Sequence, residues 1–380
     1  MLFVLAIFLF VLLVVVHEFG HYIIAKKNGV EVEEFGIGFP PRLFSKRFKN
    51  DKTIYSINLI PLGGFVQLKG ENDMDKRKGS FGAASIAVKS KIMMAGVAMN
   101  LIVAYLLFTV VALFGMPQLV CDQFSIDGGS KVIRQPDNEG VITVGTVQPN
   151  TPAQRNGLLE GDEIISINGR QIDCVEQVPA ITKENAGREI EVVTRRGNQT
   201  INNTIRLNQT RGSDGYLGIS PDTLQEDIRV TRYTWSAPIV AGGVVGQLTK
   251  LTFNGLWSAI KGLGSMIAGA LSGNNSARTE GASQASSQVT GPVGVVRLLR
   301  SSSTLGIGIT LMLIAYISLA LAIMNILPIP ALDGGKLFTT MIYRVLKKDL
   351  TPKAEKIIYG SSFAFLILLV ILITIIDVRR

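Results

Sequence analysis

Only two histidines and two cysteines occur among the 380 residues of this chain. Charged residues are also sparse at 18%, whereas 47% are hydrophobic and the mean hydropathy is +0.34, which excludes an average soluble protein. Two cysteines are too few to predict a disulfide, although Cys121 and Cys174 could pair in an oxidising compartment. No polar residue occurs from Leu2 to Val16. Together these absences favour a membrane protein.

Four segments are apolar enough to span a bilayer, for which a helix needs about 20 residues. They are Leu2–Ala25, Ile92–Phe114, Leu305–Leu327 and Ile357–Ile376. The first segment has neither a basic N-terminal region nor a small-residue cleavage site, so we predict a retained helix rather than a signal peptide. The predicted fold is a multi-span α-helical membrane protein with four transmembrane helices.

Positive charge predicts the orientation of these helices. Lys and Arg residues gather in the loop 26–91 and in the loop 336–356 between the third and fourth spans. The positive-inside bias places both loops in the cytoplasm, and both termini and the 115–304 segment outside. The net charge of +9 is then explained by helix orientation and anionic lipid. We therefore expect the lipid bilayer as a partner and no nucleic acid.

The two histidines belong to the pentapeptide His17-Glu18-Phe19-Gly20-His21, which follows the apolar run directly. Residues four apart share one face of a helix, so both imidazoles can reach one metal ion. Glu18 lies about 100° around the helix and can act on a metal-bound water, a pattern typical of zinc metallopeptidases. Ionisable groups at membrane depth usually mark function. At about 1.5 Å per residue His17 lies about 22 Å along the helix, which places the Zn²⁺ site near the cytoplasmic face.

A catalytic zinc site needs a third protein ligand and an open position. Cys121 and Cys174 are expected on the outer side, so neither suits this role. Asp333 is the better candidate, because it follows the third span just after Pro328 and Pro330 break the helix. An Asp at this position could instead cap the next helix, but its place on the side of the two histidines favours a ligand.

Several motifs resemble those of the site-2 protease family of intramembrane zinc metalloproteases, whose bacterial branch includes the regulator of sigma-E protease. The residues that carry this resemblance are the His17–His21 motif, the Leu-Asp-Gly of 332–334, the segment 61–68, Gly96-x-x-x-Asn100 and the segment 290–294. In that family a segment similar to 61–68 forms a membrane-reentrant β-hairpin, expected here at about 54–68. An exposed strand of this hairpin can pair with an unwound substrate.

The resemblance implies a site made of eight residues. The expected zinc ligands are His17, His21 and Asp333, the general base is Glu18, and the residues that position substrate are Asn100, Asn325, Gly63 and Gly64.

The segment Gly145–Gly169 resembles a PDZ domain of the bacterial protease type. It predicts a strand, a short helix from Pro152, the strand Glu163–Ile167 and an Asn-Gly hairpin, and alternation at 189–194 and 200–207 adds further strands. Such a domain either binds peptides by strand addition or only blocks access by its bulk. Beyond it, Ala237–Leu271 predicts a helix on the outer interface rather than a fifth span, and 272–288 a flexible linker.

The expected boundaries follow from these segments. They are 1–26 for the first transmembrane helix, 27–91 for the cytoplasmic loop with the hairpin, 92–115 for the second helix, 139–210 for the extracytoplasmic PDZ domain, 211–304 for the linker and interfacial helix, 305–335 for the third helix with its Leu-Asp-Gly motif, and 357–376 for the fourth helix.

The predicted function is therefore that of an intramembrane zinc metalloendopeptidase in a bacterial inner membrane. Expected substrates are single-span membrane proteins, such as an anti-sigma factor or a remnant signal peptide, after an upstream site-1-type protease has cut them outside. One alternative is an inactive relative that only binds membrane segments, although the retention of Glu18 argues against it. Another is a secondary transporter, which can also combine broken helices with an intramembrane acid.

Overall fold

The chain forms two compact units, one from Met1–Phe114 with Thr234–Arg380 and the other from Gly115–Tyr233. The structure is a computed structural model, and each unit is described by itself. The described residues are 1–49, 51–70, 75–118, 120–134, 142–172, 174–210, 215–223, 229–275, 277–278, 281, 291–348 and 350–379.

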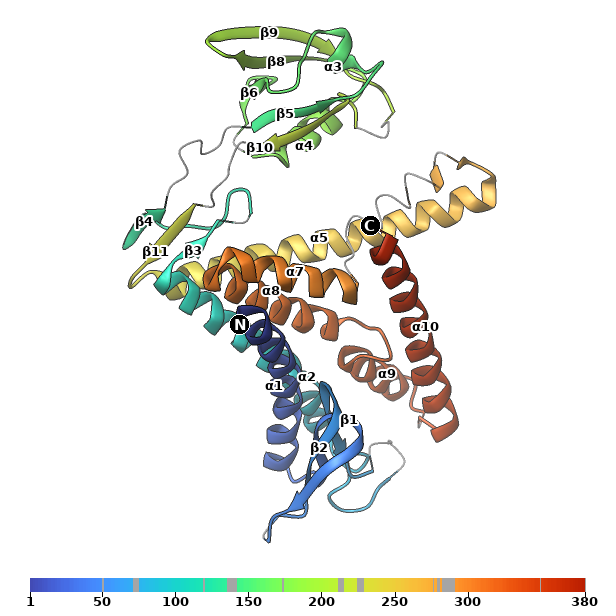
Figure 1. The fold of residues 1–380 in the computed structure, drawn as a ribbon. Helices are drawn as coiled ribbons and strands as arrows, with labels where there is room; N and C mark the ends of the chain where they lie inside the picture. Colours follow the sequence, from blue (N-terminus) through green and yellow to red (C-terminus); the bar gives the residue numbers. More distant parts are fainter. Residues whose placement is uncertain are drawn as a thin grey trace. The chain divides into compact units, whose positions relative to one another are not determined.

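The first unit is built from long apolar helices (Figure 1). Four of its described helices are long and apolar enough to cross a membrane, which agrees with the number predicted. The helices of this unit are α1 (Leu2–Lys27), α2 (Ile86–Phe114), α5 (Ala237–Ser272), α7 (Pro292–Leu305), α8 (Ile307–Ile326), α9 (Asp333–Val345) and α10 (Pro352–Arg379). The four candidate spans are α1, α2, α8 and α10.

Helix α1 buries a single face, although nearly all of its residues are apolar. Its buried residues recur at helical spacing and include Leu13, His17, Gly20 and His21. Leu13 packs with Ile314 of α8, and the remaining faces leave side chains such as Phe8 exposed. Exposed apolar side chains on such a helix are suited to lipid rather than water. Both histidines of α1 therefore lie on its packed face.

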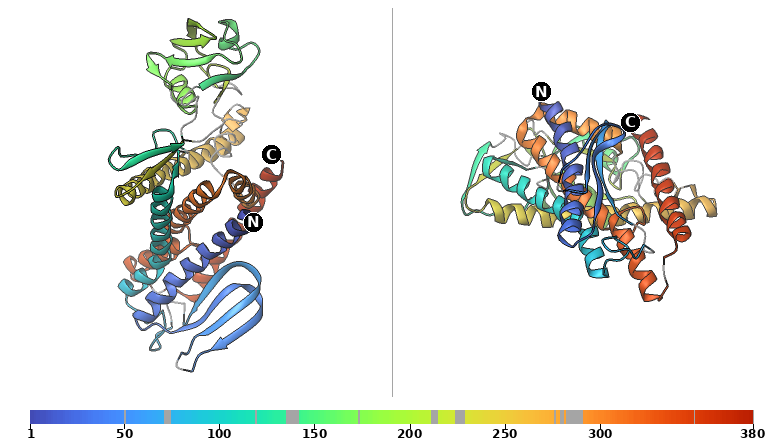
Figure 2. Two further views of the ribbon diagram at one scale, coloured as in Figure 1. Left: turned by 60° about the vertical axis from the view of Figure 1, so that its left-hand side comes forward. Right: turned by 90° about the horizontal axis from the view of Figure 1, so that it is seen from below.

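A β-sheet made of β1 (Val32–Arg47) and β2 (Ile54–Leu68) follows α1 and lies beside it (Figure 2). The first half of β1 pairs with both halves of β2, since Phe35 lies opposite both Tyr55 and Val66. The segment 54–68 is therefore not the separate hairpin that the sequence predicts. Its halves fold around β1, and Gly64–Leu68 forms an outer edge that no other strand of the described chain pairs with.

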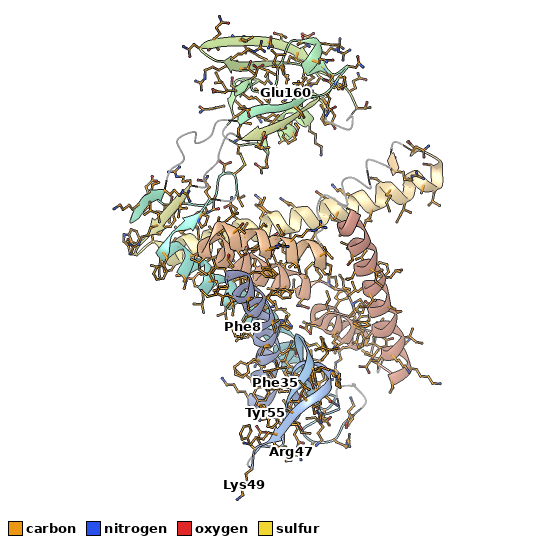
Figure 3. All side chains as sticks on the ribbon, viewed as in Figure 1. Phe8, Phe35, Arg47, Lys49, Tyr55 and Glu160 are labelled. Carbon is orange, nitrogen blue, oxygen red and sulfur yellow. A yellow bond between two sulfur atoms is a disulfide. The ribbon has the colours of Figure 1, made fainter. Side chains whose placement is uncertain are left out.

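Polar contacts fix this sheet to the end of α1. The hydroxyls of Tyr22 of α1 and Tyr55 of β2 form a hydrogen bond of 2.6 Å, and the hydroxyl of Tyr55 also donates to the Asp51 carboxylate at 2.7 Å. Lys26 forms an ion pair with the same carboxylate. Partial burial raises the pKa of Asp51, but the hydrogen bonds from Lys26, Thr53 and Tyr55 outweigh it and hold the pKa below its usual range. Phe35 and Tyr55 lie near α1, whereas Arg47 and Lys49 lie at the far end of the sheet (Figure 3).

The described residues of the second unit form two antiparallel sheets and two short helices. The larger sheet has the order β10-β5-β6-β8-β9, with β7 paired to β6, and the smaller has the order β3-β11-β4. Their bounds are β3 (Met116–Pro117), β4 (Ser130–Arg134), β5 (Ile142–Val147), β6 (Glu163–Ile167), β7 (Arg170–Gln171), β8 (Glu189–Arg196), β9 (Gln199–Arg206), β10 (Ile219–Thr223) and β11 (Val230–Tyr233), with helices α3 (Pro152–Arg155) and α4 (Gln177–Glu184). The apolar core of the larger sheet includes the fully buried side chains of Ile167, Val192 and Ile205.

Several details of this unit bear on the expectations from sequence. Cys121 and Cys174, whose pairing the sequence leaves open, form a disulfide with their Cα atoms 6.0 Å apart. Strand β10 pairs with β5, so the sheet extends past residue 210 to Thr223. Alternation of apolar residues does not reveal this strand, because its sequence Ile-Ser-Pro-Asp-Thr contains a single large apolar residue.

Two helices of the first unit also differ in extent from the predicted segments. Helix α2 begins at Ile86, six residues before the predicted span, and its first turn buries Lys89, a residue that the apolar pattern excludes from a span. Helix α5 runs from Ala237 to Ser272 and is not among the four candidate spans. Most of the predicted linker 272–288, including 282–288, lies outside the described residues, and so does Thr290 of the quoted 290–294 motif.

Candidate metal centre

The structure brings together the three side chains that the sequence predicts as metal ligands. His17 and His21 come from the packed face of α1, and Asp333 begins α9, 316 residues after His17. His17 Nε2 lies 3.0 Å from Asp333 Oδ2 and 3.2 Å from His21 Nε2, and the distance from His21 Nε2 to Asp333 Oδ2 is 3.2 Å. The three atoms thus form a nearly equilateral triangle.

The dimensions of this triangle fit one metal ion. Tetrahedral zinc with bonds of about 2.0–2.1 Å separates its ligand atoms by about 3.3 Å. The observed separations of 3.0–3.2 Å are close to that value without any movement of the chain. Both histidines are at most 9% exposed, so the nitrogens are shielded from bulk water. The donor set of two imidazoles and one carboxylate also suits zinc.

Helix α2 supplies a partner to each imidazole. The Nδ1–H of His21 donates to the backbone carbonyl of Ile92 at 2.7 Å, which leaves its Nε2 free for a metal. Asn100 Nδ2 lies 3.2 Å from His17 Nδ1. Ile92 and Asn100 are eight residues apart, so they lie on the same side of α2, two turns from each other.

Gly96 lies between these two partners and leaves room for the imidazoles. A Cβ atom at Gly96 would lie 2.5 Å from both His17 Cε1 and His21 Nε2, closer than any real Cβ contact. Gly20 of α1 is also needed for space, since a Cβ added there would lie 2.6 Å from the carbonyl oxygen of Ala95 in α2. The two glycines let α1 and α2 approach closely at the level of the site.

A tight loop after α8 places Asp333. Leu332 is the N-cap of α9, and its side chain makes no cap hydrogen bond, so Asp333 is not the cap of this helix. Its carboxylate points instead at the two histidines. Neither Gly334 nor Gly335 adopts the left-handed conformation, and they are needed for space, because a Cβ at Gly335 would lie 1.9 Å from the carbonyl oxygen of Ile329. Both glycines are therefore needed for the space that they leave and not for a left-handed backbone conformation.

The triangle opens onto a cavity of about 700 Å³. Glu18, His21 and Asp333 line one part of it, as do the edge residues Phe65 and Val66 of β2. The remaining wall is partly polar. Its polar residues are Lys336, Thr340, Glu355, Lys356 and Tyr359 from α9 and α10. The cavity is large enough to hold both water and a short stretch of peptide.

The other predicted site residues lie at varied positions around the centre. Gly64 lies on the edge strand, where a Cβ atom would contact Glu18 Cγ at 3.5 Å, and Gly63 has a left-handed φ of 84°. Asn325 is half-buried in the last turn of α8, where its backbone oxygen packs against Gly334. Asn100 is buried and faces His17 rather than the cavity lining.

Some contributors to the site are not predicted from the sequence. The carbonyl of Ile92 is a backbone group, so no side-chain pattern identifies it. Ser318 of α8 is fully buried and donates to the backbone carbonyl of Asn100 at 2.8 Å. Lys336 lines the cavity three residues after Asp333, on the same side of α9. The helical spacing from Asp333 is the one signal that could have identified Lys336.

A family model described as peptidase family M50 matches residues 5–369. The chain belongs to peptidase family M50. A protein of Clostridium acetobutylicum whose name assigns it to the zinc metalloproteases is 30% identical, over 99% of this chain and 96% of its own length. The regulator of sigma-W protease RasP of Bacillus subtilis is 24% identical, over 98% and 97%. The Enterococcus faecalis protein named as the protease Eep is 25% identical, over 98% of each chain.

The family, together with the four apolar helices, identifies this M50 peptidase as a membrane-embedded metalloprotease of the site-2 type that uses zinc.

Proposed function

We propose that His17, His21 and Asp333 hold the catalytic zinc and that Glu18 is the general base. The observation that carries this proposal is the triangle of ligand atoms, 3.0–3.2 Å on each side, at the wall of a cavity that Glu18 also lines. Three protein ligands leave the fourth tetrahedral position open, as in other catalytic zinc sites. When bound, zinc supplies a Lewis acid that acidifies water and polarises the scissile carbonyl.

Glu18 then moves the protons of the reaction. It follows His17 directly on α1, so its carboxylate lies beside the ligands without occupying a vertex of the triangle. As general base it accepts a proton from the attacking water, and it later returns a proton to the amine of the leaving peptide. The polar residues on the cavity wall, such as Lys336 and Tyr359, give water a route to a site that is surrounded by apolar helices.

We also propose that the free edge of β2 presents the substrate backbone. A transmembrane helix hides its own amides, so it must unwind before attack, and an unwound segment needs new hydrogen-bond partners. Within the part of the chain that the structure describes, one side of Gly64–Leu68 is paired with no strand, and this segment runs past Glu18. Phe65 and Val66 of this edge also line the cavity, so a strand added here would lie along the site.

The substrates that fit this site are single-span membrane proteins already cut on their outer side. RasP is named as a regulator of sigma-W protease, so an anti-sigma factor is one substrate class that we propose here, together with remnant signal peptides. An upstream protease of the site-1 type would supply the cut form. We place the site near the cytoplasmic face of a bacterial inner membrane, with the unit 115–233 outside.

We further propose that the larger sheet of the outer unit is a PDZ domain that screens substrates. Its five-strand path with α3 and α4 around one apolar core supports this assignment. Exclusion by bulk predicts that removing 142–223, which includes the paired strand β10, lets substrates with intact outer domains be cut. If the domain instead delivers substrate by strand addition, the same deletion would slow cleavage of every substrate.

The decisive experiment is co-expression of the full chain with tagged single-span substrates that carry either an intact or a truncated outer domain. Glu18→Gln keeps the size of the side chain but cannot accept a proton, so cleavage of the truncated substrate should fall by about 10²–10⁴-fold. The purified variant should keep about one zinc per chain, because its ligands are intact.

Ligand variants provide the matched comparison. His17→Ala, His21→Ala and Asp333→Ala should each lose most of the zinc, measured by metal analysis of the purified chains. Full zinc retention in Asp333→Ala would place the third ligand elsewhere. Wild-type cleavage by Glu18→Gln would refute the mechanism, whereas absence of cleavage by the unsubstituted chain would favour the non-catalytic alternative.

A further inference from the structure

Asn100 is a buried side chain whose hydrogen bonding conflicts with metal binding. The residue is 1% exposed, its Nδ2 lies 3.2 Å from His17 Nδ1, and its Oδ1 has no hydrogen-bond partner among the described residues. A buried amide oxygen without a partner is uncommon and calls for an explanation.

The conflict concerns the proton on His17, and the reasoning rests on the proposed zinc ligands. His17 directs Nε2 at Asp333 and His21, so Nε2 is the ligating atom and must be unprotonated. The neutral imidazole then carries its proton on Nδ1, which becomes a donor. An amide nitrogen is also only a donor, so Nδ1–H and the Nδ2 of Asn100 cannot bond to each other.

Exchanging the two ends of the amide resolves the conflict. Amide oxygen and nitrogen have nearly the same shape, so their assignment follows from the hydrogen bonds they make. One end of the amide is unpaired in either orientation, but only one orientation gives a metal-binding His17 an acceptor. We infer that Asn100 is a positioning residue of the zinc site, whose Oδ1 accepts the Nδ1–H of His17 and thereby fixes its Nε2 toward the metal.

The surroundings of Asn100 support this role. His21 already has the equivalent arrangement, with its Nδ1–H donating to the carbonyl of Ile92 at 2.7 Å. Helix α2 thus provides one acceptor to each imidazole, on either side of Gly96. The hydroxyl of Ser318 holds the backbone carbonyl of Asn100 from α8, which fixes the position of the residue. A role in holding substrate would instead require an amide N–H directed into the cavity.

Two substitutions at position 100 separate an acceptor from a donor. Asn100→Asp is nearly isosteric and can accept but not donate in its ionised form, whereas Asn100→Leu can do neither. Zinc affinity of the detergent-solubilised full chain is measured by competition with a chromophoric chelator. We expect Asn100→Leu to bind zinc about 10–100-fold more weakly, the usual effect of losing such a partner, and Asn100→Asp to bind at least as tightly as the wild type.

The opposite results would overturn the inference. Wild-type zinc affinity in Asn100→Leu, or an affinity in Asn100→Asp as weak as in Asn100→Leu, would show that no acceptor is needed. If Asn100→Leu fails to fold, the isosteric Asp variant decides alone, since weakened zinc binding there indicates a donor role. Thr310→Val is the control for helix packing, because this fully buried side chain of α8 donates to the carbonyls of Ser302 and Gly306 and not to the site, so zinc affinity should stay near wild type.

A second readout uses the fact that the chain has only two histidines. In zinc-loaded protein labelled with ¹⁵N-histidine, both imidazoles should show a hydrogen-bonded Nδ1–H, and Asn100→Leu should change only the signal of His17. An incorrect assignment of the zinc ligands can be distinguished from an incorrect role of Asn100. In the first case His17→Ala retains zinc, whatever the result at position 100.

Discussion

Replacing Gly96 by alanine is the smallest change that should disable the zinc site without touching a ligand. The added Cβ would lie 2.5 Å from His17 Cε1 and from His21 Nε2, and 2.6 Å from His17 Nε2. An ordinary contact begins at 3.4 Å, so the imidazoles or the helices must separate by about 0.9 Å. Zinc–ligand bonds tolerate deviations of only about 0.2 Å.

The displacement therefore predicts a loss of both zinc binding and turnover. A misplacement of about 1 Å can lower a rate by about 10²-fold, and we expect at least this loss of cleavage in Gly96→Ala. Overpacking of a close helix contact should also destabilise the helical unit by about 1–3 kcal/mol. The assays are zinc content, cleavage of a truncated single-span substrate, and thermal unfolding in detergent.

Gly246→Ala is a matched control for the helical preference of alanine. Gly246 lies in α5 with nothing within 4 Å of its added Cβ, so this variant should keep zinc and turnover. The expected change in stability is neutral to slightly favourable, because alanine suits a helix interior better than glycine. Normal zinc content and cleavage in Gly96→Ala would refute the argument that these glycine contacts set the ligand geometry.

Two further predictions concern the outer unit in the full-length protein. The Cys121–Cys174 disulfide closes a loop of 53 residues. Loss of this cross-link in the double variant Cys121→Ser, Cys174→Ser should destabilise the unit by about 4 kcal/mol, because the unfolded chain gains entropy. Unchanged hydrogen exchange of the unit would contradict this. Burial raises the pKa of Asp162, but two hydrogen bonds from Arg196 and one from the Leu159 N–H outweigh it and lower the pKa. The stability from this carboxylate is therefore full above its unfolded pKa of about 3.9 and is lost as the pH falls through the folded value. In Asp162→Asn the unfolding temperature of this unit should therefore fall less steeply as the pH is lowered in the acid range. A fall as steep as that of the wild type would refute this role.

The parts of the fold that depend on local pattern are predictable from the sequence. The unbroken apolar run before His17 predicts α1, and the Asn168-Gly169 pair predicts the tight turn between β6 and β7, where both residues have positive φ. The proximity of His17 Nε2 and His21 Nε2 also follows from their spacing alone. In each case the residues that determine the structure lie within one continuous short segment of the chain.

Features that depend on distant contacts are harder to predict. The family resemblance predicts a β-hairpin at 54–68, but the partner of this segment is the earlier strand β1, which contains a Pro-Pro pair and many charged residues. Asp333 is predicted because prolines mark the end of α8, yet its distance to His17 could come only from the packed fold. The glycines at 334 and 335 illustrate the same limit, since their role depends on the carbonyls of Ile326 and Ile329.

Helix α2 shows how a pattern on a second helix can complete a motif on the first. Its residues Ile92, Gly96 and Asn100 recur every four positions, as do His17 and His21 on α1. The carbonyl of Ile92 accepts the hydrogen bond of His21, Gly96 one turn later leaves space for both rings, and Asn100 after a further turn faces His17. A two-histidine motif on a lone helix has free Nδ1 atoms and rings that can rotate, whereas packing against this face fixes both. We therefore propose that the glycine-and-asparagine pattern belongs to the metal centre together with the histidines, because it would set which nitrogen of each ring faces the metal.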